Sequence, residues 1–418
     1  MKNLLIILIS SVTLFAACDS EDVSITYTKG TAIYGDLSAI RATELVAPSK
    51  SLNDAGKIFV SNDLLLIGEE GEGIHVYDNR NPEAPTPVSF LNIPGNREFF
   101  VDGSFIYAES YYDLLKIDIS TSQPSIVSRL EHAIADEIRG QNGESLIGFE
   151  LEEVTETFDK NDDAYSQIWD SEGFLYYDYD QRLIPPSAVP ASFAGNGTDN
   201  IGSINRIASL DNHLYVISKT TLSVYDTENF SQIFSNSVGW QMETIYPMGD
   251  RIFIGTSNSV DIFNVSNPEN PLPEGSFWHA TSCDPVLPVS EETAYATLRT
   301  GEFAECPGDV NALVVLDISS TGDWAIHQVQ EIQMESPYGL TKIGDNLYVG
   351  EGANGLKVFD ASSEQNLRLL KHDQNVEAYD VIPHPNRNDL LLIAGPDGLS
   401  QYTVGPNTDL LKLSTIAF

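Results

Sequence analysis

The sequence predicts an all-β protein whose four-stranded sheets stand side by side as the blades of a closed ring, a β-propeller. Three observations support this fold class. A pattern of turn, apolar strand, turn and apolar strand recurs along the chain. Its strands are apolar at successive positions, which is typical of strands buried on both faces. The average spacing of the units also falls in the range of ~40–45 residues that a four-stranded blade needs.

The recurring unit is clearest in "GDNLYVGEGANGLKVFD" (344–360), where Gly, Asp and Asn mark the turns before and between two apolar strands. Six of the seven units end in Asp or Asn, which closes a turn by accepting a hydrogen bond from the backbone two residues on. The seventh ends in Thr403. The other units occupy 62–78, 102–118, 211–226, 249–264, 292–301 with 311–317, and 388–403.

Each pair of strands is preceded and followed by one more strand-like run, for example "GKIFV" (56–60) and "PTPVSFLNI" (85–93), so a unit has four strands. A twisted sheet with two apolar faces needs a neighbour on both sides, and radial closure supplies these neighbours. Closure of the units into a ring is therefore the arrangement that the pattern favours.

The number of blades follows from the length of the repeat region, 51–418, which the irregular insertion 134–203 interrupts. Removing the insertion leaves 368 − 70 = 298 residues, or about 43 for each of seven units. The third unit ends 108 residues after the second, from Asp118 to Asp226. Seven blades are favoured, and six or eight stay open.

The N-terminus predicts export. Met1-Lys2 precedes an apolar run, Leu4 to Ala17, which is shorter than the ~20 residues of a membrane-spanning helix and typical of a secretory signal. It ends in "LFAAC", which resembles the bacterial lipobox, although Phe15 replaces the usual leucine. This resemblance implies that residues 1–17 are removed and that Cys18 carries the lipid, palmitate included, with 18–50 as tether and N-terminal segment. An ordinary signal peptide cleaved nearby is the alternative.

The four residues after Cys18, "DSED", resemble the export signal of surface lipoproteins in the Bacteroidetes group. The resemblance implies an outer-membrane protein exposed at the cell surface and anchored to the membrane only through its lipid.

The composition excludes nucleic acid as a partner. Lys and Arg number 22 and Asp and Glu 61, so the formal net charge is −39. Loss of residues 1–17 removes only Lys2, which makes the mature charge 21 − 61 = −40. Such a surface repels nucleic acid and anionic lipid headgroups.

Three segments, "LVVLD" (313–317), "LKVFD" (356–360) and "LKIDIS" (115–120), resemble the repeat of the LVIVD-repeat propeller proteins. The resemblance extends over roughly residues 31–404. It implies a β-propeller on a secreted or surface lipoprotein, and it implies no reaction.

A ring of polar residues is expected near one mouth of the central channel, because blades begin next to the axis. Converging polar groups at such a mouth form a candidate ligand site. The alternative is that Arg97 and Arg206 pair with the acidic members and tie neighbouring blades together. The candidates are Asn96, Arg97, Asn205, Arg206, Glu243, Asp284, Tyr338, Tyr379 and Asp380.

A second pattern lies in the insertion, where four residues match positions 1, 3, 5 and 12 of an EF-hand loop: Asp159, Asn161, Asp163 and Asp170. Ala164 replaces the glycine that the turn of such a loop needs. A solvated acidic turn is therefore favoured over Ca²⁺ binding, and no other cofactor is expected.

The function favoured by the sequence is that of a non-catalytic scaffold that binds an envelope protein or a glycan. The sequence has no Gly-x-Ser-x-Gly, His-Glu-x-x-His or phosphate-loop motif. The alternative is an envelope hydrolase or lyase, with Glu243 or Asp284 as base and Tyr338 or Tyr379 as acid.

Cys283 and Cys306 are expected to form a disulfide, because an oxidising compartment does not readily leave two thiols free; two buried free thiols are the alternative. The loop of about 24 residues would add roughly 3 kcal/mol to stability. Peptide mass mapping without reductant should recover the two cysteines in one cross-linked peptide. Free thiols on both residues would contradict the bridge.

Overall fold

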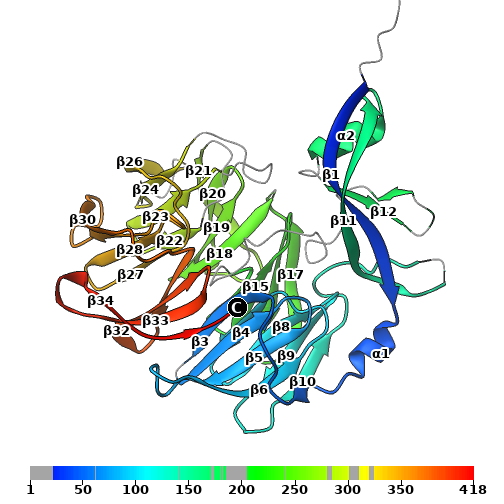
Figure 1. Ribbon diagram of the computed structural model, residues 1–418, viewed down its shortest axis with the longest axis horizontal. Coiled ribbons are helices and arrows are strands. Elements are labelled where there is room, and N and C mark those ends of the chain that lie inside the picture. The colour runs from blue at the N-terminus through cyan, green and yellow to red at the C-terminus, as the bar shows by residue number, and fades with distance from the viewer. Residues whose placement is uncertain are drawn as a thin grey trace, which may run out of the picture.

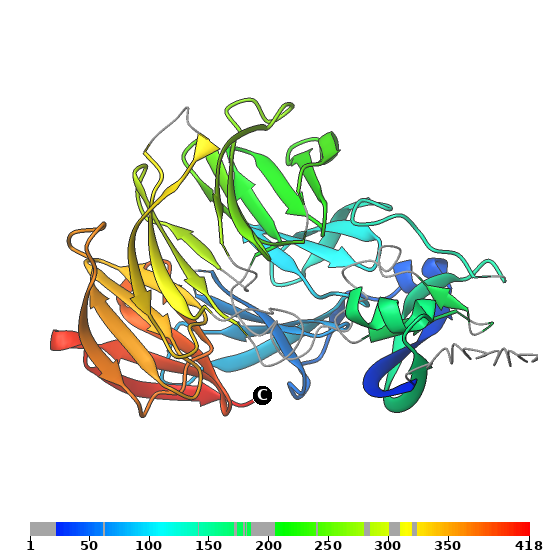
Figure 2. The same cartoon turned by 90° about the horizontal axis from the view of Figure 1, so that it is seen from above.

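The computed structural model describes residues 22–61, 63–140, 142–170, 174–178, 180, 182–184, 205–239, 241–279, 285–300, 310–319 and 324–418. Within these ranges the strands form eight sheets. Seven sheets form the ring seen in Figures 1 and 2, and the eighth forms an arm beside it. The all-β class and the seven-blade ring are thereby confirmed.

Each blade has four antiparallel strands in chain order, and only in blade 5 does a strand of another sheet, β25 (Trp324–Ala325), come between two of them. Blade 1 contains β3 (Ala55–Ser61), β4 (Leu64–Glu69), β5 (Gly73–Asp78) and β6 (Thr86–Asn92). Blade 2 contains β7 (Phe99–Asp102), β8 (Phe105–Ser110), β9 (Asp113–Asp118) and β10 (Ser125–Leu130). Blade 3 contains β14 (Ile207–Leu210), β15 (His213–Ile217), β16 (Thr221–Asp226) and β17 (Ser231–Ser237).

Blades 4 and 5 contain β18 (Met242–Met248), β19 (Arg251–Thr256), β20 (Ser259–Asn264) and β21 (Leu272–Trp278); and β22 (Val286–Pro288), β23 (Thr293–Leu298), β24 (Ala312–Asp317) and β26 (His327–Gln333). Blade 6 contains β27 (Leu340–Ile343), β28 (Asn346–Gly350), β29 (Leu356–Asp360) and β30 (Arg368–Asp373). Blade 7 contains β31 (Asp380–His384), β32 (Arg387–Gly395), β33 (Gly398–Val404) and β34 (Leu410–Ile416), with the short 3-10 helix η3 (Pro406–Thr408) before β34.

The first strand of each blade lies innermost. Several of these strands contact the first strand of the next blade, as β14 does with β18 and β27 with β31. Two short strands extend outer edges: β2 (Val46–Ala47) pairs with β6, and β25 (Trp324–Ala325) pairs with β21.

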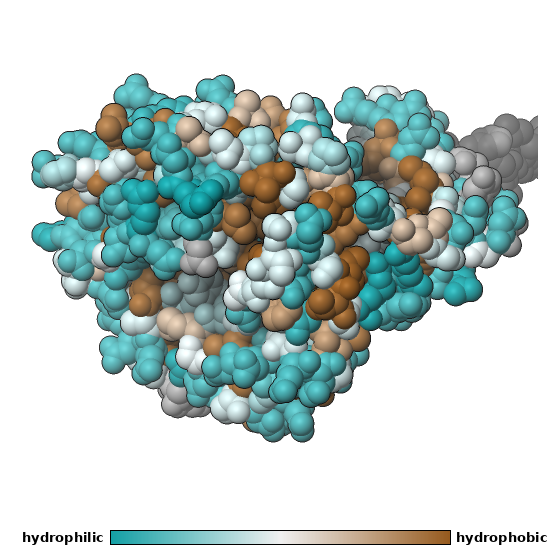
Figure 3. Space-filling view, turned by 90° about the horizontal axis from the view of Figure 1, so that it is seen from below, coloured by the Kyte–Doolittle hydropathy of each residue, from teal (hydrophilic) through white to brown (hydrophobic). Residues whose placement is uncertain are grey.

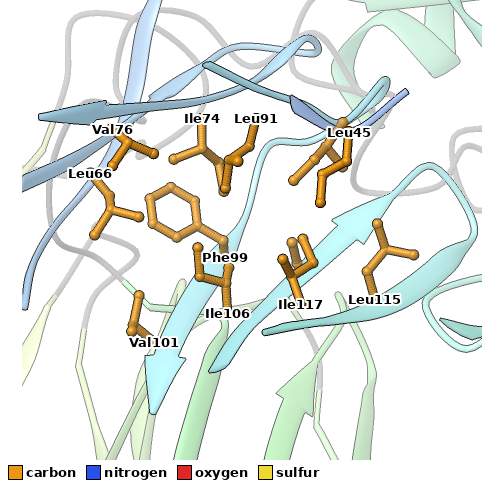
Figure 4. Packing of buried hydrophobic residues seen from close by; sticks show 12 residues of the cluster. Leu45, Leu66, Ile74, Val76, Leu91, Phe99, Val101, Ile106, Leu115 and Ile117 are labelled. Carbon is orange, nitrogen blue, oxygen red and sulfur yellow. The ribbon is translucent and has the colours of Figure 1, made fainter. Parts of the chain in front are cut away.

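Apolar side chains fill the space between every two neighbouring blades. Figure 4 shows the layer between blades 1 and 2, where Leu66 and Ile74 of blade 1 face Phe99 and Ile106 of blade 2. Six further buried clusters occupy the other interfaces of the ring. Full burial of one such side chain is worth about 1.5–3 kcal/mol, so the ring is stabilised mainly by contacts between blades.

The ring closes through side chains between blades 7 and 1. Leu390 and Leu392 of blade 7 pack in one cluster with Ile58 and Ile67 of blade 1. The side-chain amides of Asn79 and Gln401 exchange two buried hydrogen bonds, of 3.0 and 2.8 Å. The chain therefore closes the ring without sharing a strand between its first and last blades.

The residue that ends the third strand shapes the next turn, as the sequence indicates. In five blades its side chain accepts a hydrogen bond from the backbone N–H two residues on, for example Asp360 from Ser362 at 3.0 Å. In blade 3 Asp226 accepts from Asn229 instead. Hydrogen bonding to Arg80 and to Ser362, respectively, lowers the pKa of Asp78 and of Asp360 to about 2.

A β-bulge recurs where the third strand of each blade pairs with the fourth. The extra residue lies in the outer strand, for example Val88, Val127, Val329 and Leu370. These four are also exposed hydrophobic side chains. Bulges twist an outer edge and discourage pairing with other molecules, so these residues have a structural explanation. Figure 3 shows that hydrophilic residues otherwise cover most of the periphery of one face.

The arm is a long ribbon with short strands beside it. β1 (Asp22–Gly35) pairs with β11 (Ser145–Asp159) over its whole length. β12 (Phe174–Tyr177), β13 (Leu183–Ile184) and α2 (Asp163–Asp170) complete it. The insertion between blades 2 and 3 therefore contains regular elements, which pair with the N-terminal segment. Figures 1 and 2 show the arm standing to one side of the ring.

Blade 2 holds the base of the arm. Asp113, nearly fully buried, accepts two hydrogen bonds from Arg41, at 2.8 and 2.9 Å, and one from Arg129 at 2.9 Å. Arg41 ends α1 (Leu37–Arg41), whose first turn is capped by Asp36. Tyr112 donates a hydrogen bond to the carbonyl of Leu146 in β11. Ionic and apolar contacts together fix the arm against blade 2.

In the part of the chain that the structure describes, no helix is long and apolar enough to cross a bilayer.

Replacing Gln401 with Ala should lower the free energy of unfolding by about 1–3 kcal/mol, because the buried side-chain amide of Asn79 loses its two hydrogen bonds to Gln401. Urea unfolding measures this change. Gln333→Ala, at an exposed position of β26, is the matched control and should change stability by no more than about 0.5 kcal/mol. Equal effects of the two substitutions would contradict a closed seam.

Candidate functional site

The candidate site lies where the first strands of the blades begin, an end of the ring that we call the axial mouth. Six charged residues from blades 1, 2 and 3, with the segments that lead into these blades, form what we call the mouth cluster. They are Lys57, Glu70, Arg97, Glu98, Glu109 and Arg206.

Lys57 connects three blades. It lies in β3, only 3% exposed, and its Nζ donates to Asn205 Oδ1 at 2.6 Å. The same Nζ is 3.5 Å from Glu98 Oε1. Burial lowers the pKa of Lys57, while the negative charges of Glu98 and Asp380 oppose that shift. The first strand of blade 1 is thus tied to the segments that lead into blades 2 and 3.

Glu98 directly precedes β7 and is 7% exposed. Its Oε2 accepts a hydrogen bond from the backbone N–H of Arg206 at 3.3 Å. Its Oε1 has no hydrogen-bond partner among the described residues. Burial raises the pKa of Glu98, and the charges of Lys57 and Arg206 counteract this effect.

Arg97 forms the second ion pair of the cluster. Its Nε is 3.1 Å from Glu70 Oε1, and its backbone N–H donates to Glu109 Oε1 at 3.1 Å. Burial raises the pKa of Glu70, while the nearby guanidinium of Arg97 lowers it. The segment that enters blade 2 is therefore held by Glu70 of blade 1 and by Glu109 of blade 2.

Glu109 is the most strongly perturbed carboxyl group of the cluster. It is 7% exposed, and burial raises its pKa to about 8, with Glu98 adding to the rise and Arg206 opposing it. At neutral pH the side chain is therefore mainly an uncharged acid that can donate a hydrogen bond.

The position of Glu109 recurs in two other blades, nine residues before the aspartate that ends the third strand. Glu69 in blade 1 and Glu351 in blade 6 occupy it. Glu351 accepts the backbone N–H of Glu335 and Glu69 that of Asn53, as Glu109 accepts that of Arg97. A glutamate at this position thus ties the incoming segment to its blade.

Blades 6 and 7 contribute aromatic residues to the mouth. Tyr338 and Tyr379 pack edge to face at 5.1 Å between ring centroids, and Arg299 lies 4.3 Å over the ring of Tyr338. Tyr379 donates a hydrogen bond to Glu377, and burial together with this bond raises its pKa to about 12. Asp380 is buried and accepts from the backbone N–H of Val381.

The structure therefore brings most of the sequence-predicted mouth residues together in two groups. Asn96 is buried and donates its amide to the carbonyls of Glu98 and Glu109, which is a structural role. Glu243 lies in β18 of blade 4 and is half-buried. The residues Asp284, Cys18, Cys283 and Cys306 lie outside the described residues.

The candidate calcium residues lie at the far end of the arm, between β11 and α2. Asp159 accepts hydrogen bonds from the backbone and the side chain of Asn161. Asp163 is exposed, and the side chain of Asp170 is not among those described. In the described ranges, no three His, Cys, Asp or Glu side chains are grouped so as to hold a metal ion.

Sequence reasoning missed four members of the cluster: Lys57, Glu70, Glu98 and Glu109. Glu98 is the neighbour of the predicted Arg97, and Lys57 lies two residues after the start of β3, so a register shift of one or two residues hid these two members. The repeated glutamate nine residues before the terminal aspartate was a usable signal for Glu109.

The arrangement combines fixed ion pairs with donors and acceptors at a point where several blades meet. Such a site can orient a polar ligand without further folding, since its side chains are held by neighbouring blades.

No family model and no curated protein matches this sequence. Among solved structures, the chain is similar to the computationally designed Ika8 protein, with 11% identity over 90% of this chain and 91% of that chain and a TM-score of 0.53. It is also similar to a chain of the mitotic checkpoint complex, with 11% identity over 87% and 95% and a TM-score of 0.53. BamB from Moraxella catarrhalis aligns at 8% identity over 91% and 97%, with a TM-score of 0.49. Identities this low concern the fold, which is that of a β-propeller.

Glu109 should give the protein a characteristic pH dependence. The folded state retains a proton that the unfolded state releases above its ordinary pKa of about 4.3. Between that value and about 8 the unfolded state binds fewer protons, so stability falls as pH rises. In Glu109→Gln, the free energy of unfolding measured in urea should therefore vary less with pH between pH 5 and 8.

Glu269→Gln, at an exposed turn of blade 4, is the control and should keep the slope of the unsubstituted protein. An unchanged slope in Glu109→Gln would show that this carboxyl group titrates normally.

Proposed function

We propose that this chain is a lipid-anchored protein on the outer side of the cell envelope, whose propeller is a non-catalytic scaffold for an envelope protein or a glycan. The lipobox-like "LFAAC" with Cys18 supports the anchor, and the acidic "DSED" supports surface exposure. The LVIVD-like segments support, within this proposal, a relation to the repeat propellers of Bacteroidetes-type surface lipoproteins.

The observation that carries the binding role is the mouth cluster. Charged residues from three blades converge there, and Lys57, Glu98 and Glu109 are all more than nine-tenths buried. Burying charged groups costs free energy that the fold must offset elsewhere. A propeller held together by apolar layers does not need such a cluster for its stability, so we infer that it serves a ligand.

The arm supports a role in holding the propeller away from the membrane surface. β1 begins at Asp22, only four residues after Cys18, and continues for fourteen residues to the base of the arm on blade 2. At ~3.3 Å per residue, this strand spans about 45 Å. An anchor at Cys18 would therefore hold the propeller away from the bilayer on a paired ribbon instead of a loose tether.

Catalysis is the second candidate, and the raised pKa of Glu109 is the observation that favours it, because acids of pKa near neutrality are useful in proton transfer. Against it, Tyr379 is engaged with Glu377, Tyr338 with Arg299, and Arg97 with Glu70. Side chains tied to such partners are better suited to binding than to moving protons.

The anchor is tested by blocking lipoprotein signal peptidase with globomycin in cells that express the full chain. We expect the uncleaved form to accumulate, and radiolabelled palmitate to enter the protein only when Cys18 is present. Cys18→Ala should abolish labelling, while Cys283→Ala, the matched cysteine control, should retain it. Normal size under the block, with label independent of Cys18, would contradict the proposal.

A further inference from the structure

The guanidinium of Arg206 has no hydrogen-bond or ion-pair partner among the residues that the structure describes. It is half-buried at the axial mouth, and its backbone N–H is fixed by Glu98. Every other arginine of the chain pairs with a carboxylate or lies over an aromatic ring. In a chain with such an excess of acidic residues, one guanidinium without a carboxylate is unexpected.

The charges around Arg206 are already paired with one another. Lys57 pairs with Glu98, and Arg97 pairs with Glu70. The side chain of Arg206 acts on Glu98 and Glu109 through its charge, without a hydrogen bond or ion pair to either carboxyl group. The guanidinium of Arg206 therefore offers N–H donors that no described carboxylate receives.

Comparison of the blades shows why Glu109 has no basic side chain opposite it in its own sheet. In blade 6 the equivalent Glu351 lies 2.8 Å from Lys357, and in blade 1 Glu69 lies 2.7 Å from His75. The corresponding position in blade 2 is occupied by Leu115, which packs in the apolar layer toward blade 1. Blade 2 thus differs at this position from blades 1 and 6, which share the glutamate.

We propose that the axial mouth binds a ligand through a carboxylate group, which Arg206 receives in a bidentate ion pair while the acid of Glu109 donates a second hydrogen bond. This proposal rests on the proposed binding function and names its ligand chemistry. A guanidinium presents two parallel N–H groups that match a carboxylate in geometry. A carboxylate would also supply an acceptor for the N–H groups of the Arg206 guanidinium.

Two sources of the carboxylate fit this chemistry: the C-terminus of a peptide and an acidic sugar such as a uronic acid. The overall negative charge repels either ligand at long range, but salt at 0.15 M screens charges beyond about 8 Å.

The test is calorimetric titration of the full mature protein in detergent with four probes at 0.15 M salt. Glucuronate is compared with glucose, and a tripeptide with its C-terminal amide. We expect either glucuronate or the tripeptide acid to bind, and its uncharged counterpart, glucose or the tripeptide amide, to bind at least tenfold more weakly. Which acid binds identifies the source of the carboxylate. Arg206→Gln should weaken that binding by about tenfold to a hundredfold.

Arg387→Gln is the matched control, because Arg387 pairs only with the exposed Asp389 in blade 7; it should leave binding unchanged. Arg206→Lys retains the charge and should keep part of the affinity, so loss through misfolding is distinguished from loss of the guanidinium. Circular dichroism of each variant checks that it is folded.

The pH dependence adds an independent readout. Glu109 is surrounded by Glu70, Arg97, Glu98 and Arg206, and when it ionises its charge competes with the ligand for Arg206. Affinity for the acid should therefore fall as pH rises from 6.5 to 9, and Glu109→Gln should bind with little pH dependence. Binding that tightens over this range would indicate a cationic ligand and overturn the proposal.

The proposal is also overturned if neither acid binds at millimolar concentration, or if Arg206→Gln binds as well as the unsubstituted protein. These titrations do not depend on where the protein resides. Failure of the carboxylate site would leave the labelling of Cys18 unchanged, and failure of the anchor would leave the titrations unchanged.

Discussion

The structure depends on one constraint, that each sheet is apolar on both faces and no blade can stand alone in water. The middle strands of every blade are buried, and each layer between blades is filled by side chains from two sheets. Only a closed ring gives the first and last blades the same cover as the others. The seam between blades 7 and 1, with its packed leucines and the Asn79–Gln401 pair, is therefore a requirement of the fold.

The same constraint explains which parts of the fold could be predicted from sequence. A blade is built from contacts between strands that follow one another, so short apolar runs and the turn residues between them carried the information. Blade 7 forms although Thr403 replaces the terminal aspartate, because its apolar strands still face two neighbours. The arm had no such local signal, since β1 pairs with strands more than a hundred residues away.

The candidate site was predictable only in its location. The rule that blades begin at the axis correctly located Arg97, Arg206 and Asn205. It missed the side chains that hold these residues, Lys57 and Glu98, although both lie within two residues of predicted positions. Side-chain direction alternates along a strand, so an error of one residue changes the face. That the guanidinium of Arg206 has no ion pair among the described residues depends on how side chains of different blades are placed, which the repeat pattern does not encode.

Native-state hydrogen exchange tests closure of the ring most directly. In a closed ring, amides of β4 and β5 in blade 1 and of β32 and β33 in blade 7 should be protected as strongly as those of the middle blades, because all share apolar layers on both sides. In an open array the terminal blades lose one neighbour and would exchange first, as end repeats do in linear repeat proteins. Equal protection around the seven blades is the result expected, and early exchange confined to blades 1 and 7 would contradict the closed ring.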